Sequence, residues 1–110
     1  MMNPDTLFHD LIVLVERGLV VASDHAEEEL MHDRIAFKEI VIGIKSGVII
    51  EAYPDYHKGP CLLLLQNDNQ GDPIHVLWGI RANTTEPAVI ITAYRPDPLR
   101  WKNQFKDRMK

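Results

Sequence analysis

The spacing of the apolar residues changes at Gly47, and this change constrains the fold of the 110-residue chain more than any other feature. Before Gly47, apolar side chains recur every three or four residues, as on one face of a helix. After Gly47, they alternate with other side chains or form short uninterrupted runs, as in β-strands. Helices followed by strands are typical of an α+β fold, in which the helices pack on one face of a sheet.

The helical half of the chain predicts three helices. The first begins at the capping residue Asn3 and ends at Gly18, and the second begins at Ser23. The third ends at Gly47 and contains Gly43, which costs about 1 kcal/mol relative to alanine inside a helix. A glycine at this position indicates that another segment packs closely against the third helix.

The second half of the chain predicts a sheet. Four long strands are expected, at residues 48–53, 61–65, 74–80 and 88–94. Residues 19–22 are short and rich in valine, so they form either an edge strand or an extended connector. The connections between the long strands are short and polar, which favours antiparallel neighbours. We therefore predict a single domain over residues 1–110, with the N-terminal helices on one face of a mostly antiparallel sheet of four or five strands. Beyond Pro96 we expect a turn and a short basic helix.

The composition excludes several classes of protein. The single cysteine, Cys61, cannot form a disulfide within the chain, and its apolar surroundings indicate an inert core thiol. No apolar run approaches the roughly 18 residues that a membrane-spanning helix needs. The first residues lack the basic region of a secretory signal, so we expect a soluble, cytoplasmic protein with no membrane contact.

Charge is distributed unevenly along the chain. Residues 5–39 carry a net charge of −6, residues 40–94 carry −2 and residues 95–110 carry +4, within an overall net charge of −4. A net-acidic chain binds nucleic acid poorly without a local basic cluster, because cationic contacts to phosphate dominate such binding. The basic C-terminal segment could therefore meet phosphate, the acidic face of another protein, or the acidic helices of this chain.

His25, Glu29 and His32 are spaced so that one side of a straight helix would carry all three. Such a set could hold zinc, but the spacing differs from the paired histidines of zinc proteases, and a solvated acidic face explains the same residues. We therefore expect no metal and no cofactor. His25 also follows the Ser23 cap, where the helix dipole disfavours protonation, so its imidazole is either a general base or a structural group.

Alternation along the strands sorts the polar side chains by face. Glu51 and Tyr53 share a face of one strand, His75 lies on a face of another, and Tyr94 lies on the last strand just before Arg95. If the strands pair in sequence order, these groups meet on the face away from the helices. Such a cluster can cleave RNA without metal, by taking the 2′-OH proton, protonating the leaving oxygen and stabilising the charged phosphorane. The alternative is that His75 and Tyr94 are half-buried structural groups.

An ordered series of short segments resembles the DUF4258 family, from about residue 19 to residue 108. The segments are SDHAEE at 23–28, DRI at 33–35, GVIIEAYPD at 47–55, GPCL at 59–62, IHV at 74–76 and IITAYRPDP at 90–98, followed by Trp101. Where this chain has Glu29, many members of the family carry an arginine, which would bind phosphate better.

The resemblance implies a fold like that of the small RelE, MqsR and BrnT toxins, which are metal-independent ribonucleases paired with antitoxins. On this interpretation His25 and His75 are the catalytic acid–base pair, Glu51 and Tyr94 support them, and Arg95 contacts the phosphate of an RNA substrate. The substrate-binding side chains would be Tyr53, Arg95, Trp101 and Arg108. The competing hypothesis is a non-catalytic module that binds a protein partner, a cognate antitoxin or another protein, through the sheet face or the basic C-terminal tail.

Overall fold

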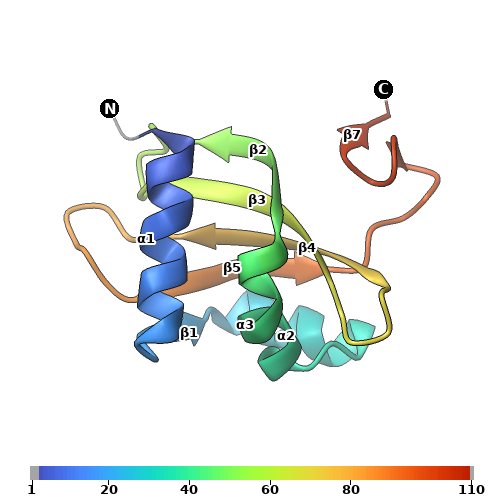
Figure 1. Ribbon diagram of the computed structural model, residues 1–110, viewed down its shortest axis with the longest axis horizontal. Coiled ribbons are helices and arrows are strands. Elements are labelled where there is room, and N and C mark those ends of the chain that lie inside the picture. The colour runs from blue at the N-terminus through green and yellow to red at the C-terminus, as the bar shows by residue number, and fades with distance from the viewer. Residues whose placement is uncertain (1–2, 110) are drawn as a thin grey trace.

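Helix α1 (Pro4–Glu16) opens the part of the chain that the computed structural model describes, residues 3–109. The side chain of Asn3 caps this helix by accepting a hydrogen bond from the backbone N–H of Asp5 at 2.8 Å, as the sequence predicts. Its buried leucines recur along one face, at Leu7, Leu11 and Leu14. In Figure 1, α1 crosses in front of the sheet. Neither α1 nor any other helix within residues 3–109 is long and apolar enough to cross a membrane.

Five strands form the main sheet, in the order β1-β5-β4-β3-β2 (Figure 1). Their bounds are β1 (Val20–Ala22), β2 (Val48–Tyr53), β3 (Cys61–Asn67), β4 (Pro73–Gly79) and β5 (Ala88–Tyr94). Strands β2 to β5 pair antiparallel with one another, while the short β1 pairs parallel to β5. The predicted α+β fold with a mostly antiparallel sheet is therefore confirmed, and residues 20–22 form an edge strand.

Helices α1 and α3 pack on one face of the sheet and form the core with it. Helix α3 spans Phe37–Gly43, and the 3-10 turn η1 (Ile44–Ser46) follows it directly. Gly43 lets α3 approach β3, because a Cβ there would lie 3.1 Å from Nε2 of Gln66. The buried Gln66 amide donates to the backbone O of Ile40 at 2.9 Å and accepts from the indole N–H of Trp78 at 2.8 Å. The close packing predicted at Gly43 is therefore confirmed.

Helix α2 (Asp24–Asp33) runs beside the second half of β5, beyond the point where β1 ends. The hydroxyl of Ser23 caps the helix by accepting a hydrogen bond from the N–H of Ala26, and it donates to the backbone O of Ile91. Two carboxylates of α2 then accept backbone N–H groups of the strand: Glu29 from Ala93 at 3.2 Å, and Asp33 from Arg95 at 2.9 Å. Helix α2 therefore closes the edge of β5 that β1 leaves open.

The C-terminal segment forms a hairpin of two short strands, β6 (Trp101–Lys102) and β7 (Asp107–Arg108), so the prediction of a basic helix is wrong. Three consecutive residues between these strands adopt the left-handed region, with φ of 53°, 57° and 69° at Asn103, Gln104 and Phe105. The chain reverses there and cannot continue as a right-handed helix. The reversal accompanies burial of the Trp101 indole on the sheet, a tertiary contact that outweighs local preference. We call residues 101–108 the C-terminal hairpin.

Candidate functional site

The face of the sheet opposite α1 and α3, here called the outer face, carries most of the predicted site residues. Alternation puts Glu51 and Tyr53 of β2 on this face, together with His75 of β4 and Tyr94 of β5. The register of β4 and β5 pairs His75 directly with Tyr94. The C-terminal hairpin lies on the same face, with its Trp101 ring 4.2 Å from the His75 ring, centroid to centroid. His75 and Tyr94 therefore lie at the hairpin end of the outer face, while the register puts Glu51 in its middle row and Tyr53 nearer its other end.

His75 is fully buried beneath the C-terminal hairpin. Its Nε2 donates to the backbone O of Phe105 at 2.8 Å, which leaves Nδ1 to accept a hydrogen bond from the hydroxyl of Tyr94 at 3.2 Å. Burial lowers the pKa of His75 and raises the pKa of Tyr94, so both groups are neutral at pH 7. With no exposed surface and both nitrogens bonded, the imidazole holds the hairpin on the sheet and does not face solvent.

Glu51, Tyr53 and Arg108 form a cluster at the edge of the hairpin. Nε of Arg108 donates to Oε2 of Glu51 at 2.6 Å, and Nη2 donates to Oε1 at 2.9 Å, while the Tyr53 hydroxyl also donates to this carboxylate. The hydrogen bonds from Arg108 hold the pKa of Glu51 below its usual value, and the bond to Glu51 raises the pKa of Tyr53. The Arg108 guanidinium also lies 4.8 Å from the centre of the Trp101 ring, within range of a cation–π contact.

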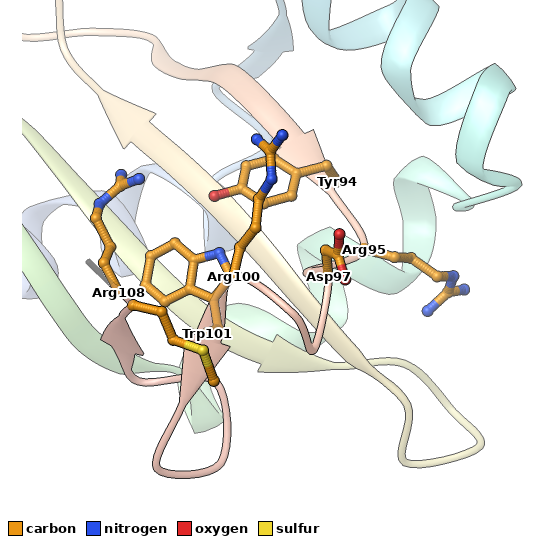
Figure 2. A pocket seen from close by; sticks show the side chains of 7 residues that line it. Tyr94, Arg95, Asp97, Arg100, Trp101 and Arg108 are labelled. Carbon is orange, nitrogen blue, oxygen red and sulfur yellow. The ribbon is translucent and has the colours of Figure 1, made fainter.

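A pocket of about 530 Å³ opens between the end of β5 and the C-terminal hairpin (Figure 2). We call it the arginine pocket; it is lined by Tyr94, Arg95, Asp97, Arg100, Trp101, Arg108 and Met109. In Figure 2 the side chain of Arg95 points away from Trp101 and Arg108, consistent with its 3.0 Å ion pair to Asp68 in the β3–β4 loop. Arg100, by contrast, is exposed and forms no ion pair with any residue from 3 to 109.

The cations of the C-terminal segment pair with the sheet and its loops, and not with the acidic helices. Arg95 pairs with Asp68 and Arg108 pairs with Glu51, and within the described part of the chain no salt bridge joins this segment to α1, α2 or α3. The charge of the acidic helices therefore does not neutralise the arginine pocket directly. Guanidinium groups beside aromatic rings suit a ligand that carries both phosphate and a flat ring.

His25 lies outside this assembly. It stands on α2 with 68% of its side chain exposed, and its Nε2 lies 3.2 Å from Oε1 of Glu29. A separate shallow pocket contains it, together with Glu28, Glu29, His32 and Asp33, and none of these residues lines the arginine pocket. The structure therefore does not bring His25 and His75 together. Over residues 3–109, no three histidine, cysteine, aspartate or glutamate side chains gather closely enough to hold a metal ion.

Comparison with known proteins gives one match. The family model described as "Domain of unknown function (DUF4258)" matches residues 22–95, from the end of β1 to the residue after β5. The chain belongs to the DUF4258 family. No curated protein and no solved structure matches it. The DUF4258 match ends at Arg95, so Arg100, Trp101 and Arg108 of the arginine pocket lie beyond the matched range.

Sequence patterns alone indicate most of the side chains at this site of the DUF4258 chain, but they miss two groups. Arg100 is indicated by nothing more specific than the +4 charge of residues 95–110. The backbone O of Phe105, which accepts the His75 hydrogen bond, has no signature in the sequence at all. Trp101 and Arg108 were expected to bind substrate, and both line the arginine pocket, but they also hold His75 and Glu51 in place.

Proposed function

We propose that this domain binds single-stranded RNA at the arginine pocket, with phosphate groups of the RNA against its guanidinium groups. One observation carries the proposal: the side chains of Arg100 and Arg108 line one pocket together with the aromatic rings of Tyr94 and Trp101. Arg95 also lines this pocket, but its guanidinium is paired with Asp68. Arginine presents a planar fork of donors that matches phosphate oxygens, and aromatic rings stack on exposed bases of single strands. A pocket that offers both groups fits a nucleotide chain better than a small inorganic anion.

The charge distribution supports the same proposal. The chain as a whole is acidic, but residues 95–110 carry a net charge of +4. Binding at the arginine pocket should therefore depend on this region and weaken steeply with salt, because phosphate contacts release counterions. Arg100 is the most informative side chain, since its exposed guanidinium has no carboxylate partner within residues 3–109 to compete with phosphate.

The test is binding of a fluorescently labelled oligouridylate, followed by anisotropy at low salt. Arg100→Gln should weaken binding roughly ten-fold, because one charge-assisted hydrogen bond contributes about 1.5 kcal/mol or more and 1.4 kcal/mol is a factor of ten. Lys38→Gln, which removes an exposed cation on α3, is the matched control and should change binding little. Equal effects of the two substitutions would contradict the proposal. Tight binding of an acidic peptide in place of RNA would favour the protein-interaction module instead.

RNA cleavage, as in a metal-independent ribonuclease toxin, is a second candidate function, and the Glu51–Tyr53–Arg108 cluster favours it. In such a step the 2′-oxygen attacks phosphorus and the bond to the 5′-oxygen breaks, which leaves a cyclic phosphate. Glu51 would take the 2′-OH proton, Tyr53 would protonate the leaving 5′-oxygen, and Arg108 would stabilise the phosphorane. The raised pKa of Tyr53 keeps its proton available, while the lowered pKa of Glu51 makes it a weak base.

This second function is tested by expressing the chain and following growth and RNA integrity. Growth arrest with RNA cleavage, lost in both Glu51→Gln and Tyr53→Phe, would support it. His25→Ala should retain the activity, because His25 lies outside the assembly. Loss of activity in His25→Ala would instead indicate that His25 takes part in the acid–base catalysis. A neighbouring open reading frame that encodes a small DNA-binding or zinc-finger antitoxin would further support a toxin–antitoxin pair.

A further inference from the structure

A second group of cations lies at the other end of the outer face. The β2–β3 loop carries Lys58, and the residue Arg81 follows β4 closely; both side chains are exposed. The backbone O of Lys58 accepts a hydrogen bond from the N–H of Ala82 at 2.9 Å, which fixes the two segments side by side. Gly59 permits this approach, because its φ is +128° and a Cβ there would lie only 2.0 Å from the backbone O of Ile80.

These two cations line a pocket of about 440 Å³ with an exposed aromatic ring. Lys58 and Arg81 form no ion pair with any residue in the described range 3–109. Tyr56, which is 47% exposed, lines the same pocket, and its ring lies 4.7 Å from that of His57. The pocket therefore repeats the combination found in the arginine pocket, unpaired positive charge beside an aromatic ring.

Both pockets open on the same face of the sheet. The second pocket is lined by Gly79, Val89 and Ile91, whereas Tyr94 lines the arginine pocket. The register pairs Gly79 with Val89 and His75 with Tyr94, so the two pockets lie along the same pair of strands. Five residues of strand separate Val89 from Tyr94, a distance of roughly 17 Å at about 3.3 Å per residue. Figure 1 places the loops after β2 and β4 at the left end of the sheet and the C-terminal hairpin at the right.

The surface between the pockets is partly exposed and partly apolar. Leu77 and Thr92 pair with each other in the middle of the outer face, and both are partly exposed. Neither carries a charge, and the carboxylate in the same row, that of Glu51 on β2, is paired with Arg108. The distance between the pockets, the cations at both ends and the partly exposed surface between them fit one short extended RNA strand.

We propose that Tyr56, Lys58 and Arg81 form a second RNA subsite, and that a single strand of about four nucleotides runs across the outer face from this subsite to the arginine pocket. The inference rests on the proposed RNA binding and adds the length and path of the ligand. A dinucleotide occupies the arginine pocket alone. A longer strand contacts both pockets and gains the phosphate contacts of Lys58 and Arg81.

The test compares labelled oligouridylates of two and eight nucleotides on the full chain, with wild type and the double variant Lys58→Gln/Arg81→Gln. The variant should bind the octamer about ten-fold more weakly or worse and leave dinucleotide binding unchanged. The slope of log affinity against log salt for the octamer should fall by about 0.7 for each phosphate that the variant no longer neutralises. Arg17→Gln/Lys38→Gln, which removes the same charge from exposed positions at the end of α1 and within α3, is the matched control and should leave the binding of both ligands unchanged.

Each other outcome overturns the inference in an identifiable way. Equal octamer affinity in wild type and Lys58→Gln/Arg81→Gln overturns the second subsite. The proposed function still stands in that case if Arg100→Gln weakens binding of the dinucleotide. An equal loss of affinity in the matched control shows an effect of net charge and also overturns the subsite. Failure of both oligonucleotides to bind the wild-type chain overturns both the subsite and the proposed RNA binding.

Discussion

The imidazole of His75 is fully buried, yet each of its nitrogens has a hydrogen-bond partner. Burial of a polar group is tolerated when its hydrogen bonds are satisfied, and one such group can link parts of a fold that are distant in sequence. Here the ring joins β4 to β5 through Tyr94 and to the C-terminal hairpin through Phe105. A histidine that carries out this role needs to stay neutral, since protonated Nδ1 could no longer accept the Tyr94 hydrogen bond.

The stability of the protein should therefore depend on pH through His75. Because burial lowers the pKa of His75 below its ordinary 6.5, the unfolded chain binds a proton at this position under conditions where the native protein does not. The stability associated with neutral His75 is present above pH 6.5 and is lost as the pH falls below that value. His75→Gln should cost roughly 1–3 kcal/mol at pH 7.5, and the difference from wild type should shrink at pH 5.5. Urea unfolding of both proteins at the two pH values measures this; a difference independent of pH would contradict it.

The part of the candidate site that lies on the strands could be predicted from the sequence, because side chains alternate between the two faces of a strand. This alternation correctly places His75, Tyr94 and Glu51 on one face. Whether that face is open depends on where the C-terminal segment goes, and this follows from the contact between Trp101 and His75, which no local pattern encodes. Without that contact, the local sequence of the C-terminal segment predicts a helix. The sequence pairs His25 with His75 only because both are imidazoles, and the path of α2 along β5 separates the two residues.

At the scale of the elements, α2 and β5 show how a helix can close a sheet edge. A free edge exposes backbone N–H groups, and proteins protect such edges by covering them. The carboxylates of Glu29 and Asp33 accept the N–H groups of Ala93 and Arg95. Partial burial raises the pKa of Asp33, but the hydrogen bonds from Arg95 and His32 outweigh this effect and hold that pKa below its usual value.

Asp33→Ala should destabilise the protein by about 1–2 kcal/mol, because it leaves the backbone N–H of Arg95 without its acceptor. Asp33→Asn retains an acceptor oxygen and should lose less. Glu28→Ala is the control, since Glu28 is exposed on the same helix and should change the free energy of unfolding by less than about 0.5 kcal/mol. Chemical denaturation of the three variants gives these values. If Asp33→Ala and Glu28→Ala behave alike, the edge contact contributes no stability.

The long elements were predictable because each has a strong period and clear ends, such as the Asn3 and Ser23 caps. The parallel pair of β1 and β5 was not. β1 has only three residues, and its partner Ala88–Ile90 lies more than sixty residues along the chain. A pattern that short cannot indicate a pairing partner, whereas neighbouring strands joined by short loops indicate each other.

At the scale of the whole molecule, the C-terminal hairpin is attached differently from every other strand. Strands β6 and β7 pair only with each other, so no backbone ladder joins them to the main sheet. The attachment consists of the Trp101 and His75 rings, the bond from His75 to Phe105, and the Arg108–Glu51 ion pair. A segment held by few buried groups can open at a lower free energy than the core, without unfolding of the remainder.

Trp101→Ala should therefore release the C-terminal hairpin while the sheet stays folded. Trypsin can cleave the released segment at Arg100, Lys102, Lys106 and Arg108, so limited proteolysis followed by mass spectrometry should show early loss of the last ten residues. Trp101→Phe keeps an aromatic ring against His75 and should resist trypsin almost as well as wild type.

Helical circular dichroism separates local release from general unfolding. Local release leaves the signal of α1, α2 and α3 at its wild-type value, because these helices still pack on the sheet. General unfolding would remove the signal. That result would contradict the prediction, and it would place Trp101 in the same cooperative unit as the core, where a tryptophan-to-alanine change costs about 3–5 kcal/mol.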